Sequence, residues 1–390
     1  MKTRSLVLVS SVAVALLACL VTSMTVLPDR ARASTTVPDG FTDSTEVSGL
    51  TNPTDMEFSP RGKLFIVQDT GKISVLGPNG KLRTFLNFSE RIDSRSGRGM
   101  LALTFDPDFS TNHYVYLHFT RKAVGTSAAH NRIVRVTAGN GDRFVKGSEK
   151  LVFRLGALGP VAEDPQYMGG ALDFGQDHKL YVATGQYEAD DNSQMLNNLF
   201  GKILRINSDG TVPTDNPFYS TASGKNRAIW ALGLRNPFKF AIQPGTTNIF
   251  INDVGENTWE EINRGAAGAN FGWPVAEGAA GDPAYVDPIF AYAHHGDDPA
   301  TTGCAITGGT FYDPQTSLYP QDYEGDYFFA DFCSGWIRTL DPTSREVSGF
   351  ASGLVRPIDL EVGPDSMLYY LAKGETSTSA YVGRIGYPAN

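Results

Sequence analysis

A stretch of sequence near the N-terminus of this 390-residue chain recurs near its C-terminus. Residues 48–65 read SGLTNPTDMEFSPRGKLF and residues 352–369 read SGLVRPIDLEVGPDSMLY, so Ser, Gly, Leu, Pro, Asp, Glu, Pro and Leu repeat in register at an offset of 304. Weaker copies of the same pattern begin at Gly99, Gly169, Gly233 and Ala305. Each copy contains a short apolar strand, a turn with Pro, Asp or Gly, and a second strand centred on an aromatic residue. Such copies restrict the chain to a repeat architecture.

Six units can be counted from the aromatic residues at the centres of the second strands. These residues are Phe65, Tyr116, Tyr181, Phe250, Phe328 and Tyr369. No amphipathic helix of useful length separates the units, which argues against a parallel sheet with crossover helices, and 41 Gly and 22 Pro favour β structure with many turns. The sequence therefore predicts an all-β fold, a six-bladed β-propeller of four-stranded antiparallel blades, with a β-sandwich as the alternative. We expect the propeller to span residues 45–387 after a short linker at 34–44, and Thr45 to lie in a strand that closes the last blade.

The N-terminus has the pattern of an export signal. Lys2 and Arg4 precede an almost wholly apolar run from Leu6 to Val21, and Ala31-Arg32-Ala33 is a small-x-small cleavage site. The run is too short for a typical membrane span, so we expect residues 1–33 to be removed as a signal peptide. An alternative is lipid attachment at Cys19, because Leu16-Leu17-Ala18-Cys19 approximates a bacterial lipobox. The protein is thus expected to be secreted, periplasmic or at the cell surface.

Charge and cysteine content limit the partners of the exported chain. Removal of residues 1–33 takes away four basic residues and one acidic residue, which leaves 29 Lys and Arg, 41 Asp and Glu, and a net charge of −12. Such a chain is a poor partner for nucleic acid, which requires a basic surface. Cys304 and Cys333 are the two cysteines left, and in an exported protein they most simply form one disulfide. Two buried free thiols are the alternative.

The copies also indicate where a binding site lies. When they are superposed, one turn position before the first strand is occupied by Thr51, Arg98, Tyr167, Arg235, Ala305 and Val355, and the next by Asn52, Gly99, Met168, Asn236, Ile306 and Arg356. In a propeller the first strands line a central channel, so these turns open at one mouth. We expect Arg98, Arg235 and Arg356 to meet there with Asn236 and Tyr167, and to bind a planar or carboxylate-bearing ligand. The alternative is that each arginine pairs with a local carboxylate such as Asp55, Asp173 or Asp359.

Several longer motifs resemble one known family. They are WALGLRNPF (230–238), INDVGENTWEEIN (251–263), GANFGWP (268–274), LFGKILRINSDGTVPTDNPF (199–218), ITGGTFY (306–312) and DLEVGPD (359–365). Their order over residues 45–387 is similar to that of the soluble PQQ-dependent sugar dehydrogenases, the glucose/sorbosone dehydrogenase family. GDYFFADFCSGWI (325–337) resembles a secreted bacterial branch that carries the Cys304 and Cys333 pair.

The resemblance implies a cofactor, a metal and a reaction. It implies that the quinone PQQ lies over the channel mouth and accepts hydride from C1 of a sugar, with calcium bridging it to backbone carbonyls. Arg235, Asn236 and Arg356 match residues that contact the cofactor, and Arg98 joins them from the repeat alignment. Gly255 and Glu256 match the positions whose carbonyls reach the calcium ion. The acceptor that reoxidises the cofactor is not indicated by the sequence.

The catalytic dyad of the family is altered in this chain. The family's histidine base precedes a Gly-Gly turn, but here the turn reads Tyr167-Met168-Gly169-Gly170, and Gln186 stands where a carboxylate orients that histidine. A cofactor-contacting lysine expected near Cys333 is absent, and Ile358 replaces a second arginine. Tyrosine is mostly protonated at neutral pH and is therefore a poor base.

Three functions remain open from the sequence. The first is a PQQ-dependent aldose-type dehydrogenase in which Tyr167, with its phenolate favoured by Arg98 or Arg235, replaces the histidine. The second is a non-catalytic propeller that binds a carbohydrate. The third is a calcium-dependent lactonase-type hydrolase, for which Glu188, Asp253 and His294 are candidates. Trp273 is the tryptophan best placed to stack on a ring near the channel.

Overall fold

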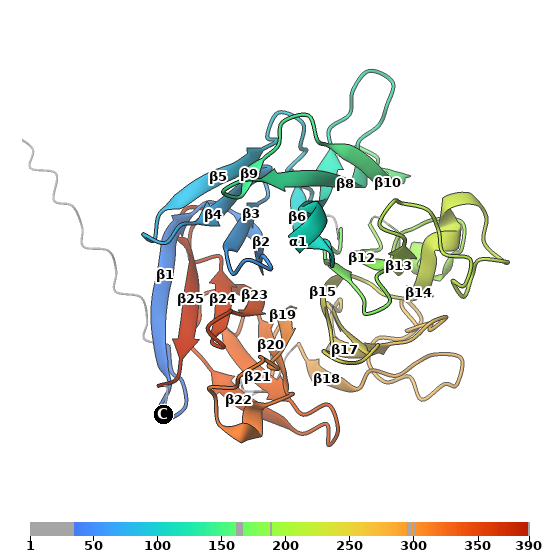
Figure 1. The fold of residues 1–390 in the computed structure, drawn as a ribbon. Helices are drawn as coiled ribbons and strands as arrows, with labels where there is room; N and C mark the ends of the chain where they lie inside the picture. The colour runs from blue at the N-terminus through green and yellow to red at the C-terminus, as the bar shows by residue number, and fades with distance from the viewer. Residues whose placement is uncertain are drawn as a thin grey trace, which may run out of the picture. The chain divides into compact units, whose positions relative to one another are not determined.

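A computed structural model of the chain describes residues 35–160, 167–187, 189–294, 296, 298 and 301–388. The expected signal peptide with Cys19, and the candidate Glu188, lie outside the described residues. Six antiparallel sheets are arranged around a common centre (Figure 1). The all-β, six-bladed propeller predicted from the repeats is therefore confirmed.

Each blade is built on four strands, and the strand named first for each blade below is the inner one, which lies beside the inner strands of adjacent blades. Blade one contains β2 (Pro53–Phe58), β3 (Leu64–Gln68), β4 (Lys72–Leu76) and β5 (Leu82–Asn87). Blade two contains β6 (Met100–Phe105), β7 (Tyr114–Arg121), β8 (His130–Gly139) and β10 (Lys150–Ala157), with β9 (Arg143–Phe144) beside β8. Blade three contains β11 (Leu172–Phe174), β12 (Leu180–Thr184), β13 (Lys202–Ile206) and β14 (Ile229–Leu232).

The remaining three blades follow the same plan. Blade four contains β15 (Pro237–Ile242), β16 (Ile249–Asp253), β17 (Trp259–Gly265) and β18 (Phe290–Ala293). Blade five contains β19 (Ile306–Phe311), β20 (Tyr327–Asp331), β21 (Trp336–Leu340) and β22 (Val347–Ala351). Blade six contains β23 (Pro357–Val362), β24 (Leu368–Ala372), β25 (Ala380–Gly386) and β1 (Thr42–Leu50). The helical segments are short: α1 (Phe109–Asn112) and the 3₁₀ turns η1 (Asp190–Gln194), η2 (Gly224–Ala228) and η3 (Gln321–Tyr323).

The outermost strand of blade six comes from the N-terminal part of the chain. β1 pairs antiparallel with β25, from Thr42 opposite Gly386 to Leu50 opposite Ala380. This pairing confirms the prediction that the segment before Gly49 closes the last blade. β1 begins at Thr42, within residues 34–44, which were expected to be a linker. Phe41, just before the strand, packs in the core against Tyr319.

Apolar side chains fill the seams between blades. All six aromatic residues that mark the repeats lie on the second strand of their blade, and all except the half-buried Tyr369 are buried. In the described part of the chain each of the six seams has its own apolar cluster; Phe65 and Leu117, for example, belong to the cluster between blades one and two. Strands buried on both faces account for the near-continuous apolar runs in the second strands.

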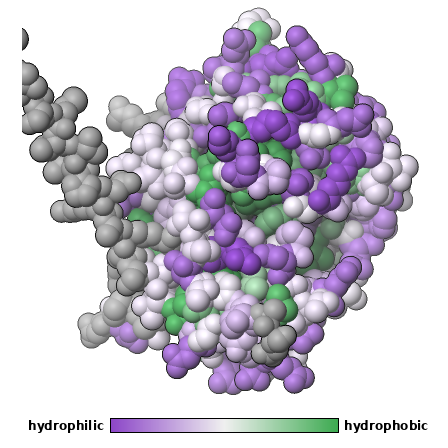
Figure 2. Space-filling model, turned by 60° about the vertical axis from the view of Figure 1, so that its left-hand side comes forward, coloured by the Kyte–Doolittle hydropathy of each residue, from purple (hydrophilic) through white to green (hydrophobic). Residues whose placement is uncertain are grey.

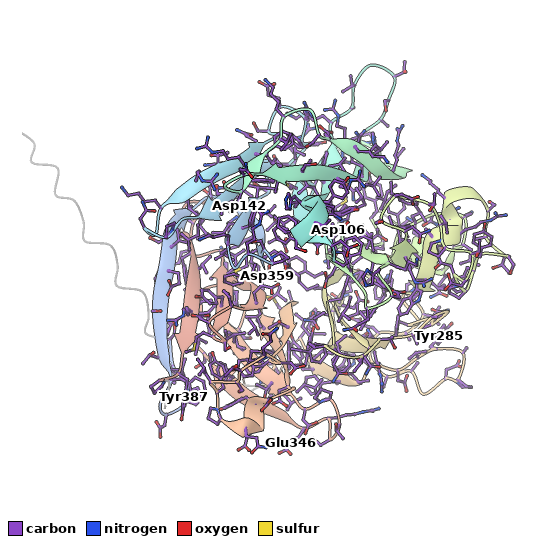
Figure 3. The ribbon with its side chains drawn as sticks, in the orientation of Figure 1. Asp106, Asp142, Tyr285, Glu346, Asp359 and Tyr387 are labelled. Carbon is purple, nitrogen blue, oxygen red and sulfur yellow. A yellow bond between two sulfur atoms is a disulfide. The ribbon has the colours of Figure 1, made fainter. Side chains whose placement is uncertain are left out.

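Carboxylates near the channel also join neighbouring blades. Asp55 accepts a hydrogen bond from the backbone N–H of Leu103 at 2.9 Å, and Asp359 accepts one from Met56 at 2.8 Å. Asp359 lies near the middle of the ring of blades, whereas Glu346 lies at its rim (Figure 3). These bonds hold adjacent inner strands in register, which fixes the positions of the turns at the mouth.

The surface is mainly polar on the side shown in Figure 2, where hydrophobic side chains are seen chiefly in recesses between hydrophilic ones. Across the described ranges, no helix is long and apolar enough to cross a lipid bilayer.

Candidate functional site

The turns that precede the inner strands lie together at one mouth of the channel, and we call them the mouth turns. A recurring backbone hydrogen bond joins each of three mouth turns to the end of the second strand of the same blade: Asp69 N–H to Asn52 O at 3.0 Å, Val254 to Asn236 at 3.1 Å, and Lys373 to Arg356 at 2.9 Å. Residues that follow second strands therefore share the mouth with the mouth turns. This relation brings Lys373 to the mouth, a residue that the sequence argument did not select.

Arg235 occupies the mouth turn before β15 and is buried. Its guanidinium donates hydrogen bonds to the carbonyls of Val254 and Gly255, and it lies over the Tyr167 ring, 4.1 Å from the centroid. The Trp273 ring is also within cation–π range, at 5.5 Å. The buried Nε of Arg235 has no hydrogen-bond partner among the residues described. A buried charged donor without a partner is costly, so Arg235 is set up to bind an acceptor supplied by a ligand.

Tyr167 is half-buried and is held by its backbone. It forms a β-bridge with Tyr187, whose N–H donates to the Tyr167 carbonyl at 3.1 Å. A Cβ added at Gly185 would lie 2.3 Å from that carbonyl, so this approach requires glycine. The sequence argument correctly identified a turn here, and the structure brings the Tyr167 ring under Arg235.

Gln186 takes a role that the sequence did not indicate. Its side-chain oxygen accepts a hydrogen bond from the Trp273 indole N–H, and both side chains are buried. Trp273 therefore presents its ring to Arg235 and is not an open platform for a sugar. The sequence argument correctly placed Trp273 near the channel. It could not indicate the contact with Gln186, because this contact joins loops of two different blades and corresponds to no pattern in the sequence.

Asn236 links two mouth turns. Its side-chain Oδ1 accepts a hydrogen bond from the Gly169 N–H at 3.0 Å, and its own backbone N–H donates to Asp253 Oδ1 at 2.7 Å. The other oxygen of Asp253 accepts from the Arg235 N–H at 2.9 Å. Asp253 thus supports the mouth turn that carries Arg235 and Asn236, and the Asn236 amide nitrogen is left to donate to a ligand.

Arg98 is surrounded by protein groups. Its buried guanidinium donates to Asp93 at 3.2 Å, to the Gly159 carbonyl at 2.8 Å and to the Tyr187 hydroxyl at 3.2 Å. For Arg98 the structure therefore shows the local pairing that the sequence left as an alternative, although the partner is Asp93. Arg98 reaches the site indirectly, through Tyr187 and its bridge to Tyr167.

Arg356 and Lys373 form a second basic pair at the mouth. Arg356 is exposed, has a left-handed φ of 57°, and extends its guanidinium to 5.8 Å from the Phe332 ring centroid. Lys373 is half-buried, and burial, together with the charge of Arg356, lowers its pKa while Asp69 opposes that shift. One nearby carboxylate does not balance two cations, so this side of the mouth favours an anionic ligand group.

The turn at residues 253–257 (DVGEN) supplies carbonyl oxygens beside Arg235. Gly255 is buried and its carbonyl accepts from Arg235, whereas Glu256 is exposed. Glu277 accepts hydrogen bonds from the N–H groups of Glu256, Asn257, Thr258 and Trp259. Burial would raise the pKa of Glu277, but these bonds and the Thr258 hydroxyl lower it to about 2. The turn is therefore rigid and carries a permanent negative charge, and a carbonyl oxygen retains a second lone pair for a cation.

Asp253 and His294, the described residues among those proposed for a hydrolase, do not come together as a metal site. Both oxygens of Asp253 accept backbone hydrogen bonds, and His294 pairs with the buried Glu260, whose hydrogen bond raises the pKa of His294. Asp253 and His294 therefore each bind a protein group of their own and do not point to a common metal ion.

Cys304 and Cys333 form the disulfide expected from the sequence. It joins the segment before β19 to the turn after β20. Asp331 accepts hydrogen bonds from the backbone N–H groups of Cys304 and Cys333, each at 2.9 Å. The bridge thereby fixes the blade-five side of the mouth, next to Phe332.

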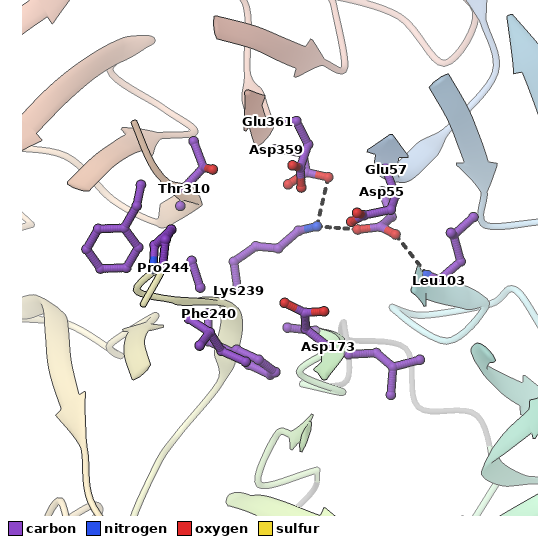
Figure 4. A pocket seen from close by; sticks show the side chains of 16 residues that line it. Asp55, Glu57, Leu103, Asp173, Lys239, Phe240, Pro244, Thr310, Asp359 and Glu361 are labelled. Carbon is purple, nitrogen blue, oxygen red and sulfur yellow. Dashed lines mark hydrogen bonds and ion pairs between the residues drawn. The ribbon is translucent and has the colours of Figure 1, made fainter. Parts of the chain in front are cut away.

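Below the mouth, the channel contains a cavity of about 150 Å³ lined by charged side chains (Figure 4). Lys239 crosses the cavity and pairs with Asp55 and with Asp359, the latter at 2.8 Å. The other carboxylates lining it are Glu57, Asp173 and Glu361. We call this set the channel cluster. Burial raises the pKa of Asp359 to about 7 and that of Asp173 to about 6, although Lys239 acts in the opposite direction on both.

Comparison with known proteins assigns the chain to a family. A family model described as glucose/sorbosone dehydrogenase matches residues 50–380, which include all six inner strands. The chain belongs to the glucose/sorbosone dehydrogenase family. The family comprises PQQ-dependent sugar dehydrogenases, so this assignment confirms the resemblance inferred from the motifs and makes the chain a member of an oxidoreductase family.

Individual relatives are 26–30% identical to this chain over the aligned residues. The uncharacterised protein slr1608 of Synechocystis is 26% identical over 83% of this chain and 82% of its own length. Quinoprotein glucose dehydrogenase B of Acinetobacter calcoaceticus is 27% identical over 70% of this chain, and the aldose sugar dehydrogenase YliI of Escherichia coli is 30% identical over 46% of it. The matched parts span 60% and 46% of the lengths of these two enzymes.

Two solved structures have the same fold as this chain. An oxidoreductase of Thermus thermophilus described as a glucose dehydrogenase superposes with a TM-score of 0.74 at 27% identity, over 89% of this chain and all of the other. The PQQ-bound aldose sugar dehydrogenase of Streptomyces coelicolor superposes with a TM-score of 0.69 at 22% identity, over 90% of this chain and all of the other, which shows the shared fold.

Proposed function

We propose that the chain is an exported, PQQ-dependent aldose-type dehydrogenase that oxidises a sugar at its anomeric carbon. The observation that carries this proposal is Arg235, a buried arginine at the channel mouth whose Nε lacks a partner among the described residues. A planar quinone with carboxylates supplies acceptors for that donor, and the quinoprotein relative supports PQQ as the group that is bound.

The residues present fit such a group. Arg235 and the amide of Asn236 would bind the quinone oxygens, and Arg356 would bind a carboxylate. Lys373 adds a cation on the same side, which compensates for the lysine that the sequence lacks near Cys333. When bound, PQQ supplies a hydride acceptor. The protein orients the sugar and cofactor and places Arg235 where negative charge develops.

Tyr167 is the residue proposed to move the proton. In its deprotonated form, its phenolate oxygen would take the proton from the anomeric hydroxyl of the sugar, as the histidine does in the family. The Arg235 guanidinium lies over the Tyr167 ring, 4.1 Å from its centroid, and holds the ring at the mouth. Gln186 acts on Trp273, and Trp273 in turn packs near the guanidinium, so the pair keeps Arg235 in place.

Calcium would be held by the carbonyl oxygens of Gly255 and Glu256. The carbonyl–carboxylate donor set, with the ionised Glu277 beside the turn, suits a hard cation. Export is supported by the basic and apolar N-terminal pattern and by the Cys304–Cys333 disulfide, since such bonds persist in oxidising compartments.

The proposal is tested on the purified mature chain with PQQ and calcium. The absorption spectrum of the bound cofactor and the reduction of an artificial acceptor are recorded across a panel of aldoses. We expect a shifted spectrum that bleaches when a sugar is added. Tyr167→Phe should retain cofactor binding but lose about 100- to 10,000-fold in rate. Tyr219→Phe is the matched control, because the Arg227 guanidinium lies 4.7 Å from its ring centroid, away from the mouth.

Other results lead to other functions. If PQQ binds but no aldose bleaches it, the site binds the cofactor and sugar oxidation at C1 is rejected. If PQQ does not bind, the dehydrogenase proposal is rejected, and glycan binding without oxidation becomes the function to test.

A further inference from the structure

A second group of cationic side chains lies on blade two, outside the mouth. The strand register places Arg121 opposite His130, and Arg154 opposite Arg132. Residues directly opposite in antiparallel strands project from the same face, and so do residues two apart in one strand. The side chains of Arg121, His130, Arg132 and Arg154 therefore share one face of the blade, and we call them the blade-two basic cluster.

This face is turned toward blade one. Phe119, which lies opposite Arg132 in the register, packs against Phe88, with ring centroids 6.3 Å apart. The segment that contains Phe88 continues to Arg91, whose carbonyl accepts a hydrogen bond from Arg121 at 3.2 Å. Arg91 itself forms an ion pair with Glu149. Glu149, a carboxylate whose charge acts on Arg132, is thus already paired with another arginine.

The cluster arginines have neutral partners. Arg154 donates to the Ser127 hydroxyl at 3.1 Å, and Arg132 donates to the His130 Nε2 at 2.6 Å. Among the residues that the structure describes, no ion pair joins Arg121, Arg132 or Arg154 to a carboxylate. The Nε of Arg132 is buried and, within the same residues, has no hydrogen-bond partner.

The charges in the cluster oppose one another. Burial, followed by the charge of Arg121, lowers the pKa of Arg132. Burial also lowers the pKa of His130, and the charges of Arg132 and Arg154 act in the same direction, so the imidazole is neutral near pH 7 and accepts from Arg132. The charge of Glu149 acts in the opposite direction on Arg132, but Glu149 is already paired with Arg91. Among the described residues the three arginines form no ion pair of their own, and in a mature chain with a net charge of −12 this points to a bound anion.

We propose that the blade-two basic cluster binds a multiply charged oxyanion group, a phosphate or a sulfate, with Arg132 and Arg154 as its forked donors. Guanidinium groups match tetrahedral oxyanions through paired N–H donors, and the unpartnered Nε of Arg132 supplies one of them. The group is free in solution or is carried on a polymer. This site is separate from the mouth and does not depend on the proposed dehydrogenase function.

Isothermal titration calorimetry on the mature chain tests the site. The probes are inorganic phosphate, inorganic sulfate and a polyphosphate chain, each at low and moderate salt. We expect Arg132→Gln and Arg154→Gln each to weaken binding about tenfold or more, because each removes charge-assisted hydrogen bonds. Arg132→Lys, which keeps the charge but loses the fork, should fall between Arg132→Gln and the unsubstituted chain.

The control is Arg83→Gln. Arg83 donates to the carbonyls of Gly141 and Asp142, so its substitution removes the same charge outside the cluster. If Arg83→Gln binds the probes within twofold of the unsubstituted chain, the site is localised to the cluster. If Arg83→Gln weakens binding as much as Arg132→Gln and Arg154→Gln do, or if none of the three probes binds the unsubstituted chain, the proposal is overturned. If polyphosphate binds more tightly per phosphate group than inorganic phosphate does, the natural ligand group is carried on a polymer. If the two probes bind equally well per phosphate group, the natural ligand is the free ion. If Arg132→Gln does not fold, the exposed Arg154 tests the proposal alone.

Discussion

Replacement of Lys239 by Met should destabilise the propeller in a pH-dependent way. The Lys239 ammonium is buried between Asp55 and Asp359 and is the cation of the channel cluster. Methionine keeps most of the apolar stem and removes the charge. The substitution therefore leaves the channel carboxylates facing one another without their counter-ion.

The size of the effect follows from the geometry. Opposite charges 2.8 Å apart, as for Lys239 and Asp359, attract by about 6 kcal/mol at an effective dielectric constant of 20. The cost of removing both charges from water offsets part of this, and removal of one member of a buried pair typically costs about 3–5 kcal/mol. We expect a loss in this range at pH 8, where the cluster is most fully ionised.

The pH dependence has a definite sign. An unfolded aspartate titrates near pH 4, whereas the pKa values of Asp359 and Asp173 in the folded chain are raised to about 7 and about 6. The folded state therefore holds more protons between about pH 4 and 7, and the contribution of these groups to stability falls as the pH rises through that window. Without Lys239 the pKa values rise further, so the variant should lose much less stability at pH 5 than at pH 8.

Urea unfolding followed by tryptophan fluorescence at pH 5, 6, 7 and 8 measures this effect. Lys81→Met, at an exposed position in the turn between β4 and β5, is the control and should change stability by less than about 0.5 kcal/mol. Lys239→Met combined with Asp359→Asn should recover part of the loss at pH 8. An equal loss for Lys239→Met at pH 5 and pH 8 would refute the electrostatic argument and assign the effect to packing.

Three further predictions concern stability. Cys304→Ser with Cys333→Ser opens a loop with a sequence separation of 29 and should cost about 3–4 kcal/mol through unfolded-state entropy, seen as a lower Tm under non-reducing conditions; an unchanged Tm contradicts it. Deletion of Thr42–Leu50 exposes the edge of β25, so cooperative unfolding in circular dichroism should be lost; a sharp transition would show that blade six is stable with three strands. Burial lowers the pKa of His118 to about 4, so the free energy of unfolding falls as the pH drops from about 6.5 toward 4. His118→Gln removes this loss, which amounts to up to about 3 kcal/mol at pH 4, and should move the midpoint of acid unfolding to lower pH. An unmoved midpoint counts against this prediction.

The repeat made most of the architecture predictable. Copies in register place equivalent residues at equivalent heights, so the second-strand aromatics and the closing strand β1 followed from the alignment alone. The repeat also contains the channel cluster. Four residues after the aligned turn positions Thr51, Arg235 and Val355 lie Asp55, Lys239 and Asp359, respectively. A comparison of the turns alone does not reveal these residues, because they occupy inward-facing positions of the strands and not the turns.

The details of the site depend on contacts that the repeat does not encode. Asp93, which captures Arg98, lies in the segment between β5 and β6 and has no counterpart in the other copies. Trp273 reaches Arg235 from the loop after β17, and Gln186 holds it from blade three. Such contacts join irregular loops, whose paths follow from packing and not from periodicity.

The pairing of β1 with β25 affects when the ring can form during synthesis. β1 precedes the other strands of the ring and its partner β25 ends at Gly386, so a chain leaving the ribosome cannot complete the ring until Gly386 has emerged. Until that moment β1 lacks its partner, because β25 has not yet been made. The closed ring therefore forms late, and a chaperone that holds the unfinished chain would act on the unpaired N-terminal strand.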